Sequence, residues 1–172
     1  MAVGDILLGE GVFYLNTTPI ALTRGGGSFT VEREYREIEA DGDYGPVKGR
    51  VRKIRSRAKL VLNALELLET NISKFYPALD YDTAGAGATI TAKDQIENAD
   101  YQDEVAWVGR TLSGKQVRIE IYNAINLEKL EWKLVDKEEV VPEITYTATY
   151  AEDSRTTEPW EVVYANDAYY SL

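Results

Sequence analysis

The sequence predicts a mainly β fold, an antiparallel β-sandwich or barrel with one flanking α-helix. Three observations lead to this prediction. Apolar residues mostly alternate with polar ones at a period of two, glycines cluster between the alternating segments, and a single stretch has helical spacing. The chain of 172 residues is long enough for one core, so we expect a single domain over residues 1–172 with an extended loop around 40–50.

The N-terminal half contains four segments that read as strands. A turn at Thr17–Pro19 separates the first two, and the third places Phe29, Val31 and Tyr35 on one side. Such alternation is typical of strands with one buried face. We expect strands at Gly11–Asn16, Ile20–Leu22, Ser28–Glu39 and Val51–Leu62.

The C-terminal half continues the same pattern. Ser113–Lys115 predicts a hairpin turn between two strands. Leu130, Trp132 and Leu134 form a further apolar row that we expect to face inward, and the tryptophans 107, 132 and 160 are expected in the core. The predicted strands are Tyr101–Leu112, Gln116–Tyr122, Glu143–Tyr150 and Trp160–Tyr164. Typical strand lengths then give about seven to nine strands in all.

One helix is expected between the two halves. The apolar residues Leu65, Leu68, Ile72, Phe75 and Tyr76 recur at helical spacing. Asn63 is placed to cap the helix with Glu66 reaching back, and Leu62 with Leu67 forms a hydrophobic staple. Pro77 ends the helix.

The composition excludes several function classes. The chain has no Cys and no His, which removes thiol nucleophiles, disulfides, structural zinc sites and histidine-based acid–base catalysis. We therefore expect a protein that is not an enzyme and that has no metal site and no cofactor. A net charge of -10 disfavours tight binding to nucleic acid phosphates. No segment is long and apolar enough for a membrane helix, and the N-terminus does not resemble a signal peptide, so no membrane partner is expected.

The most distinctive segment runs from Glu32 to Lys59. Its first part is acidic, its second part is basic, and the turn-rich run Asp41–Pro46 lies between them. If the basic part is a strand, Lys53, Arg55, Arg57 and Lys59 share one face and could bind nucleic acid. Pairing of the acidic strand with the basic one, within or between chains, is favoured because the two are adjacent in sequence.

Other motifs are weaker. Asp41–Asp43, like Asp80 and Asp82, lacks the further ligands of a calcium loop. Arg24–Ser28 lacks the Lys-Ser/Thr ending of a phosphate-binding loop. The acid pairs Glu138–Glu139 and Glu152–Asp153 suggest a small carboxylate-dependent hydrolase, but adjacent acids on a strand point to opposite faces. Turn residues and solvated charges account for all of these motifs.

The residues Gly27–Glu32 and Ile38–Gly49 resemble the tail tube (major tail) proteins of long-tailed phages, in which an early strand ends in a pattern like Ile-Glu-Ala-Asp-Gly followed by Gly-Pro-Val-Lys-Gly. Leu7–Tyr14 and the expected helix also fit, so the resemblance covers roughly the first eighty residues. It implies a fold related to the tubes of contractile tails and type VI secretion. It further implies a structural subunit that forms stacked, hexameric rings, with a lumen through which DNA passes without specific binding.

The resemblance also implies the partners and the place of action. The partners are other copies of the chain, a tape measure protein, and tail terminator and tip proteins, and the protein is made in the host cytoplasm for the virion. An alternative is the tube of a contractile injection or secretion system. The family has no catalytic residues to carry over. We expect the subunit interface to include Glu32, Glu34, Asp41, Asp43, Tyr44, Lys48, Arg50, Arg52, Lys53, Arg55, Arg57 and Lys59.

Overall fold

A computed structural model describes residues 6–20, 22–67, 69–85 and 87–165. It confirms a mainly β fold with one short α-helix: an antiparallel sheet of eight strands and a small sheet of two. The strands are β1 (Leu7–Leu15), β2 (Thr18–Pro19), β3 (Thr23–Glu37), β4 (Val51–Ala64), β5 (Leu79–Asp82), β6 (Thr89–Ala92), β7 (Gln102–Thr111), β8 (Gln116–Asn126), β9 (Glu143–Thr147) and β10 (Trp160–Ala165). The helix α1 spans Glu69–Phe75, and a 3₁₀ turn spans Asn98–Asp100.

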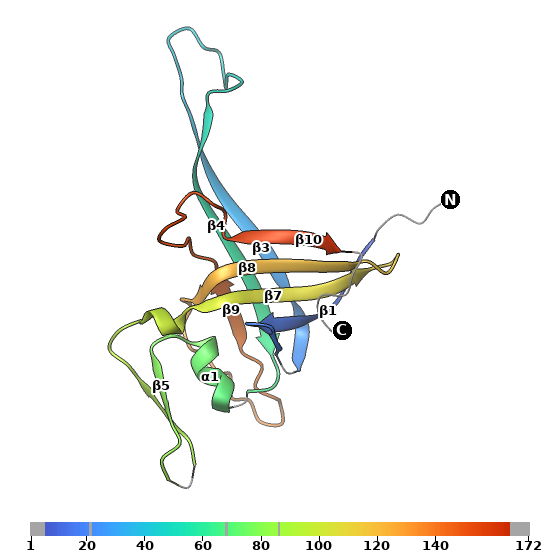
Figure 1. The fold of residues 1–172 in the computed structure, drawn as a ribbon, viewed down its shortest axis with the longest axis vertical. Helices are drawn as coiled ribbons and strands as arrows, with labels where there is room; N and C mark the ends of the chain where they lie inside the picture. The colour runs from blue at the N-terminus through green and yellow to red at the C-terminus, as the bar shows by residue number, and fades with distance from the viewer. Residues whose placement is uncertain (1–5, 21, 68, 86, 166–172) are drawn as a thin grey trace.

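The large sheet has the order β2-β1-β7-β8-β9-β4-β3, and β10 also pairs with β8. β8 pairs with β10 over residues 116–121, but with β9 only at Ile125 and Asn126. The sheet therefore turns at β8 into two layers. Figure 1 shows β3 and β4 crossing β7, β8 and β10 steeply, so the two layers pack face to face at a large angle.

The core lies between these layers. Alternate residues of the strands point inward, as the period of two predicts. Phe13, Val105 and Ile121 come from one layer, and Leu60 and Ile144 come from the other, all of them buried. Trp107 and Trp160 pack against this core while they remain partly exposed. The predicted strands around β7, β8 and β10 and the turn at Gly114 are confirmed.

The helix begins later than the sequence predicts. β4 continues to Ala64, because Leu62 and Ala64 are fully buried and Asn63 pairs with Glu143 of β9. The predicted cap at Asn63 and the staple from Leu62 are therefore wrong, since both residues belong to a strand that the core holds in place. Leu68 lies outside the described residues.

The C-terminal end of α1 is fixed to the sheet by two buried side chains. The Tyr146 hydroxyl donates a hydrogen bond to the Lys74 carbonyl at 3.0 Å, and the Asn126 amide donates to the Phe75 carbonyl at 2.8 Å. The last carbonyls of a helix lack partners within the helix. These two bonds satisfy them and place α1 across one end of the sandwich.

Several strand boundaries also differ from the prediction. Thr18–Pro19, predicted as part of a turn, forms β2, whereas Ile20 and Leu22, predicted as strand residues, lie in no strand. β1 begins at Leu7 rather than Gly11, and β8 continues to Asn126.

β3 begins at Thr23 rather than Ser28, so the glycines 25–27 lie inside a strand with a register shift. Gly27 is required there by close packing, because a Cβ atom would meet the Val61 carbonyl oxygen at 2.1 Å and the Phe13 ring at 2.7 Å. β9 ends at Thr147 rather than Tyr150. The small hairpin of β5 and β6 was not predicted.

The predicted inward row of Leu130, Trp132 and Leu134 is wrong. These residues lie in the connection between β8 and β9, outside any strand, and their exposed fractions are 53%, 39% and 79%. Trp132 is therefore not a core residue. The row alternates as a strand would, but none of the described strands pairs with it.

The β3–β4 hairpin projects far beyond the body of the molecule. In Figure 1 its tip lies at one end of the longest axis, and the β5–β6 hairpin lies at the opposite end. The projecting part of β3–β4 and its tip contain the segment that the sequence singled out. It is almost entirely exposed from Glu32 to Arg55.

Candidate assembly interface

Opposite charges face one another across β3 and β4. Glu34 lies directly opposite Arg55, and Glu32 lies opposite Arg57. Residues that lie directly opposite share one face of the sheet. Arg55 approaches Glu34 to 3.8 Å, and Lys59 approaches Glu32 to 3.8 Å. The prediction that the acidic strand pairs with the basic one is confirmed.

These charge pairs contribute little to the stability of the single chain. The Arg55 and Glu34 side chains are each 63% exposed, and their ion pair is long. Exposed pairs of this kind contribute roughly 0–1 kcal/mol to the free energy of unfolding. The ordered rows of charge therefore remain available to a partner that excludes water from them.

Lys53 does not share a face with Arg55, Arg57 and Lys59, contrary to the prediction. A register shift leaves Ile54 without a direct partner, so Lys53 lies opposite Tyr35 while Arg55 lies opposite Glu34. A bulge of this kind reverses the alternation beyond it. Lys53 therefore faces the side on which the core lies, and the predicted four-residue basic stripe is reduced to three residues.

Lys53 instead ties the hairpin to the body. Its ammonium pairs with Glu158, which also accepts hydrogen bonds from Tyr150 at 3.3 Å and from the Trp160 indole at 3.1 Å. Burial alone would raise the pKa of Glu158. The hydrogen bonds from Lys53 and Trp160 outweigh it, so the pKa of this carboxyl lies below its usual range.

Arg33 strengthens the same attachment. Its guanidinium lies 5.6 Å from the centre of the Trp160 ring, and Phe29 packs against that ring with centroids 5.7 Å apart. A cation over an indole face contributes roughly 0.5–1 kcal/mol where it is exposed. The base of the hairpin is thus held against β10, whereas the part beyond it is held only by its own strand pairing.

The tip of the hairpin is organised by one carboxylate. Asp43 accepts hydrogen bonds from the Ala40 backbone N–H at 2.9 Å and from the Arg50 guanidinium at 2.6 Å. The backbone N–H of Ile38 donates to the Arg50 carbonyl at 3.1 Å and closes the loop. Asp43 therefore acts as a turn residue, while Asp41, Tyr44 and Lys48 point into solvent.

The projecting hairpin also carries features that the sequence analysis missed. Arg36 lies directly opposite Arg52, so two like charges face each other, and neither forms an ion pair with another described residue. Large apolar side chains are exposed along the same hairpin: Tyr35, Ile38, Tyr44, Val47, Val51 and Ile54. The pairing of Arg36 with Arg52 could have been predicted if the register of the two strands had been known. Glu158, 105 residues from Lys53, left no local signal.

The structure places all of the predicted interface residues on the β3–β4 hairpin, but not on one face of it. Glu32, Glu34, Arg52, Arg55, Arg57 and Lys59 lie on the outer face, Lys53 lies on the inner face, and the remaining five lie at the tip: Asp41, Asp43, Tyr44, Lys48 and Arg50. The weaker motifs have local roles. Glu139 pairs with Arg24 at 2.8 Å, Asp80 pairs with Lys93 at 3.5 Å, and Asp82 accepts a hydrogen bond from the Ala84 N–H.

The sequence matches no protein-family model and no curated protein. Among the described residues, no helix is long and apolar enough to cross a membrane.

Proposed function

We propose that this protein is a structural subunit that assembles with copies of itself into stacked rings and so forms the tail tube of a phage. The observation that carries the proposal is the β3–β4 hairpin, which projects from the body with charges and apolar side chains that the chain itself leaves uncovered. The resemblance of Ile38–Gly49 to tail tube proteins supplies the identity of the assembly. We expect the number of subunits in each ring to be six.

The exposed apolar residues support self-assembly. Six large apolar side chains on one projecting hairpin would be a liability in a protein that stayed monomeric. A second copy that covers them would also desolvate the charge rows beside them. Opposite charges then fix the register of the contact, because like-charged registers are costly.

The open edge of β3 supports the same proposal. β3 ends the order of the large sheet, and its outer edge has no strand partner among the described residues. Proteins usually shorten or cover such edges, because they pair with other chains. An assembling ring makes use of an edge that a monomer would have to protect.

The net charge is consistent with a channel for DNA. A chain with a net charge of -10 repels phosphate, so DNA can pass along its surface without binding tightly. The role requires no catalytic residue and no cofactor. Its partners by resemblance are the tape measure protein and the tail terminator and tip proteins.

Electron microscopy of the concentrated protein tests the proposal. We expect hollow tubes or stacked rings in negative stain. Replacing both Arg55 and Arg57 with Glu should abolish them while the circular dichroism spectrum stays that of a folded β protein, because both side chains are exposed. Replacing Lys74 of α1 and Arg110 of β7 with Glu gives a control with the same change of charge at two exposed positions outside the hairpin. Normal tubes from the Arg55/Arg57 variant would refute the role of this face.

A further inference from the structure

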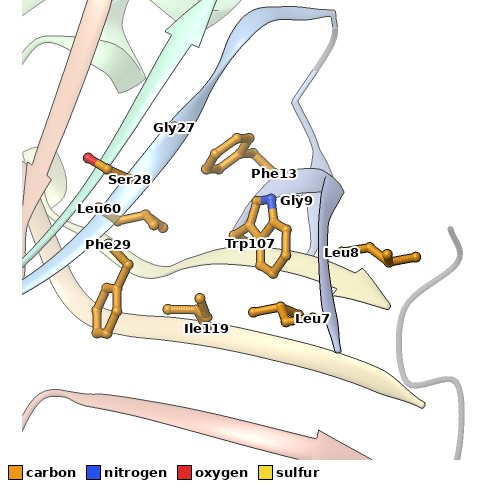
Figure 2. Close-up of a pocket in the computed structure, with 10 residues that line it drawn as sticks. All are labelled: Leu7, Leu8, Gly9, Phe13, Gly27, Ser28, Phe29, Leu60, Trp107 and Ile119. Carbon is orange, nitrogen blue, oxygen red and sulfur yellow. The ribbon is translucent and has the colours of Figure 1, made fainter. Parts of the chain in front are cut away.

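An apolar cavity opens between the two layers of the sandwich, next to the open edge of β3. Its volume is about 220 Å³, and Figure 2 shows Leu7, Phe13, Phe29, Trp107 and Ile119 around it. Apolar cavities of about 150 Å³ bind groups as large as benzene. This one can therefore hold a large apolar side chain.

The neighbouring edge of the core is also left uncovered. Val162 and Tyr164 of β10 lie opposite Ile119 and Val117 on the core-facing side of β8, but their exposed fractions are 40% and 59%. Leu7 at the mouth of the cavity is 42% exposed. An inward-facing side of a sandwich is normally covered by the other layer. Here the second layer ends at β3 and leaves part of that side open.

The connection between β8 and β9 carries the complementary feature. Leu130, Trp132 and Leu134 alternate with Glu131 and Lys133 as in a half-buried strand, yet they are exposed. The charged residues of this segment line a groove over the outer face of β4 and β9, together with Lys59 and Val61. The segment therefore lies on the outer face of the layer that contains β3, β4 and β9, whereas the cavity lies on the inner face of that layer. The segment and the cavity are thus two different surfaces of the molecule.

The geometry points to a contact between two copies of the chain, in which residues 129–134 of one copy pair antiparallel with residues 27–32 of β3 in the next. This inference rests on the proposed function and identifies the surfaces that join neighbouring subunits. A contact between two different surfaces is head-to-tail, and it closes into a ring if the rotation permits.

The register follows from the pattern of charge and apolar residues. With Lys129 opposite Glu32, Lys133 falls opposite Ser28 and Glu131 falls opposite Thr30, so no like charges face each other. The apolar row then faces the core side: Leu130 is opposite Val31, Trp132 is opposite Phe29, and Leu134 is opposite Gly27. Gly27 and Phe29 line the cavity, so Trp132 and Leu134 arrive beside it.

Disulfide cross-linking tests this register, and the chain suits it because it has no Cys of its own. A Thr30→Cys chain is mixed with a Glu131→Cys chain that carries a different tag, under assembling conditions. Directly opposite residues on antiparallel strands have Cα atoms about 4.5–5.5 Å apart, within the range for a disulfide. We expect a mixed dimer that contains both tags. Glu138→Cys, an exposed glutamate of the same connection, replaces Glu131→Cys as the matched control and should give at least about tenfold less mixed dimer.

A second variant measures the apolar contact. Leu134→Asp should raise the concentration needed for assembly at least about tenfold, which corresponds to about 1.4 kcal/mol per contact. Leu112→Asp, at another exposed leucine, should leave that concentration unchanged within about twofold. Leu134 is exposed in the single chain, so the fold of the variant should be retained, which circular dichroism checks.

The outcomes separate the inference from the proposed function. Wild-type tubes without the mixed dimer, and with normal assembly of Leu134→Asp, would overturn the inference and leave the tube in place. If the wild-type chain forms no rings or tubes at any concentration, both proposals fall.

Discussion

Arg36 of β3 and Arg52 of β4 lie directly opposite each other on the projecting hairpin, with no acidic partner among the described residues. Like charges that face each other across two strands destabilise the pair. The arrangement is unfavourable in the single chain. In the proposed assembly, an acidic surface on a neighbouring copy would relieve this repulsion.

The first prediction follows from this pair. Arg52→Glu turns the like-charged pair into an opposite-charged one, so the free energy of unfolding of the monomer should rise by roughly 0.2–1 kcal/mol. Urea denaturation at low salt measures the change. If the proposed assembly contact is correct, assembly should weaken at the same time, because the hairpin loses a positive charge on the face that we propose contacts a neighbouring copy.

Arg57→Glu is the matched control for this prediction, because it faces Glu32 and creates a like-charged pair. It should lower the free energy of unfolding by a similar amount. If both variants changed the stability in the same direction, cross-strand charge would not be the cause.

The tip of the hairpin gives the second prediction. Asp43→Ala removes the acceptor for Ala40 and Arg50, so hydrogen exchange over residues 41–50 should become faster in the monomer. The free energy of unfolding should change by less than about 0.5 kcal/mol, since the tip is exposed. In wild-type tubes the same residues should exchange more slowly than in the wild-type monomer. Equal protection of residues 41–50 in monomer and tube would contradict ordering of the tip on assembly.

The third prediction concerns the attachment of the hairpin at low pH. The pKa of Glu158 is lowered in the folded state, so its contribution to stability is present above the ordinary glutamate pKa of 4.5 and is lost as the pH falls through the lower folded value. Glu158→Gln should therefore destabilise the protein at pH 7. The difference from wild type should shrink in denaturation curves as the pH falls below 4.5. Glu152→Gln, at an exposed glutamate nearby, should change the free energy of unfolding at pH 7 by less than about 0.5 kcal/mol.

The fourth prediction concerns Glu120, whose pKa is shifted in the opposite direction to that of Glu158. Glu120 is buried and lies opposite Glu161 of β10, with Glu104, Arg118 and Tyr122 on the neighbouring positions of the same face. Burial raises the pKa of Glu120 above its ordinary value. The folded state then binds more protons than the unfolded state, so this residue makes the protein less stable as the pH rises above about 4.5.

Glu120→Gln should consequently stabilise the protein at pH 7, with a gain that disappears at low pH. Thermal unfolding at several pH values measures it. A variant that is less stable than wild type at pH 7 would show that the hydrogen bond from Tyr122 at 3.0 Å and the ion pair with Arg118 at 3.4 Å together outweigh the cost of the buried charge.

The fifth prediction tests how α1 is held. Tyr146→Phe removes the hydrogen bond to the Lys74 carbonyl and leaves the ring in place, so the free energy of unfolding should fall by about 1–1.5 kcal/mol. Tyr164→Phe, at an exposed tyrosine, should change it by less than about 0.5 kcal/mol. An equal effect of the two substitutions would mean that the bond to the helix contributes nothing.

Local pattern was sufficient for the class of fold and for most strands. The strand from Gln116 to Tyr122 could be predicted from its alternation, because a period of two places all apolar side chains on the face that packs against the core. The turn at Gly114 could be predicted from its own residues. The same reasoning correctly paired the acidic strand with the basic one, since the two are joined by a short turn-rich loop.

Tertiary structure alone decided the remaining features. Asn63 has the chemistry of a helix cap, but burial of Leu62 and Ala64 keeps it in β4. The bulge at Ile54 placed Lys53 on the opposite face from the one predicted. Its ion-pair partner, Glu158, lies 105 residues away in the sequence. The row of Leu130, Trp132 and Leu134 has the period of a strand, but none of the strands that the structure describes pairs with it. Sequence determines the face that a strand presents, whereas a second strand or a second subunit determines whether that face is covered.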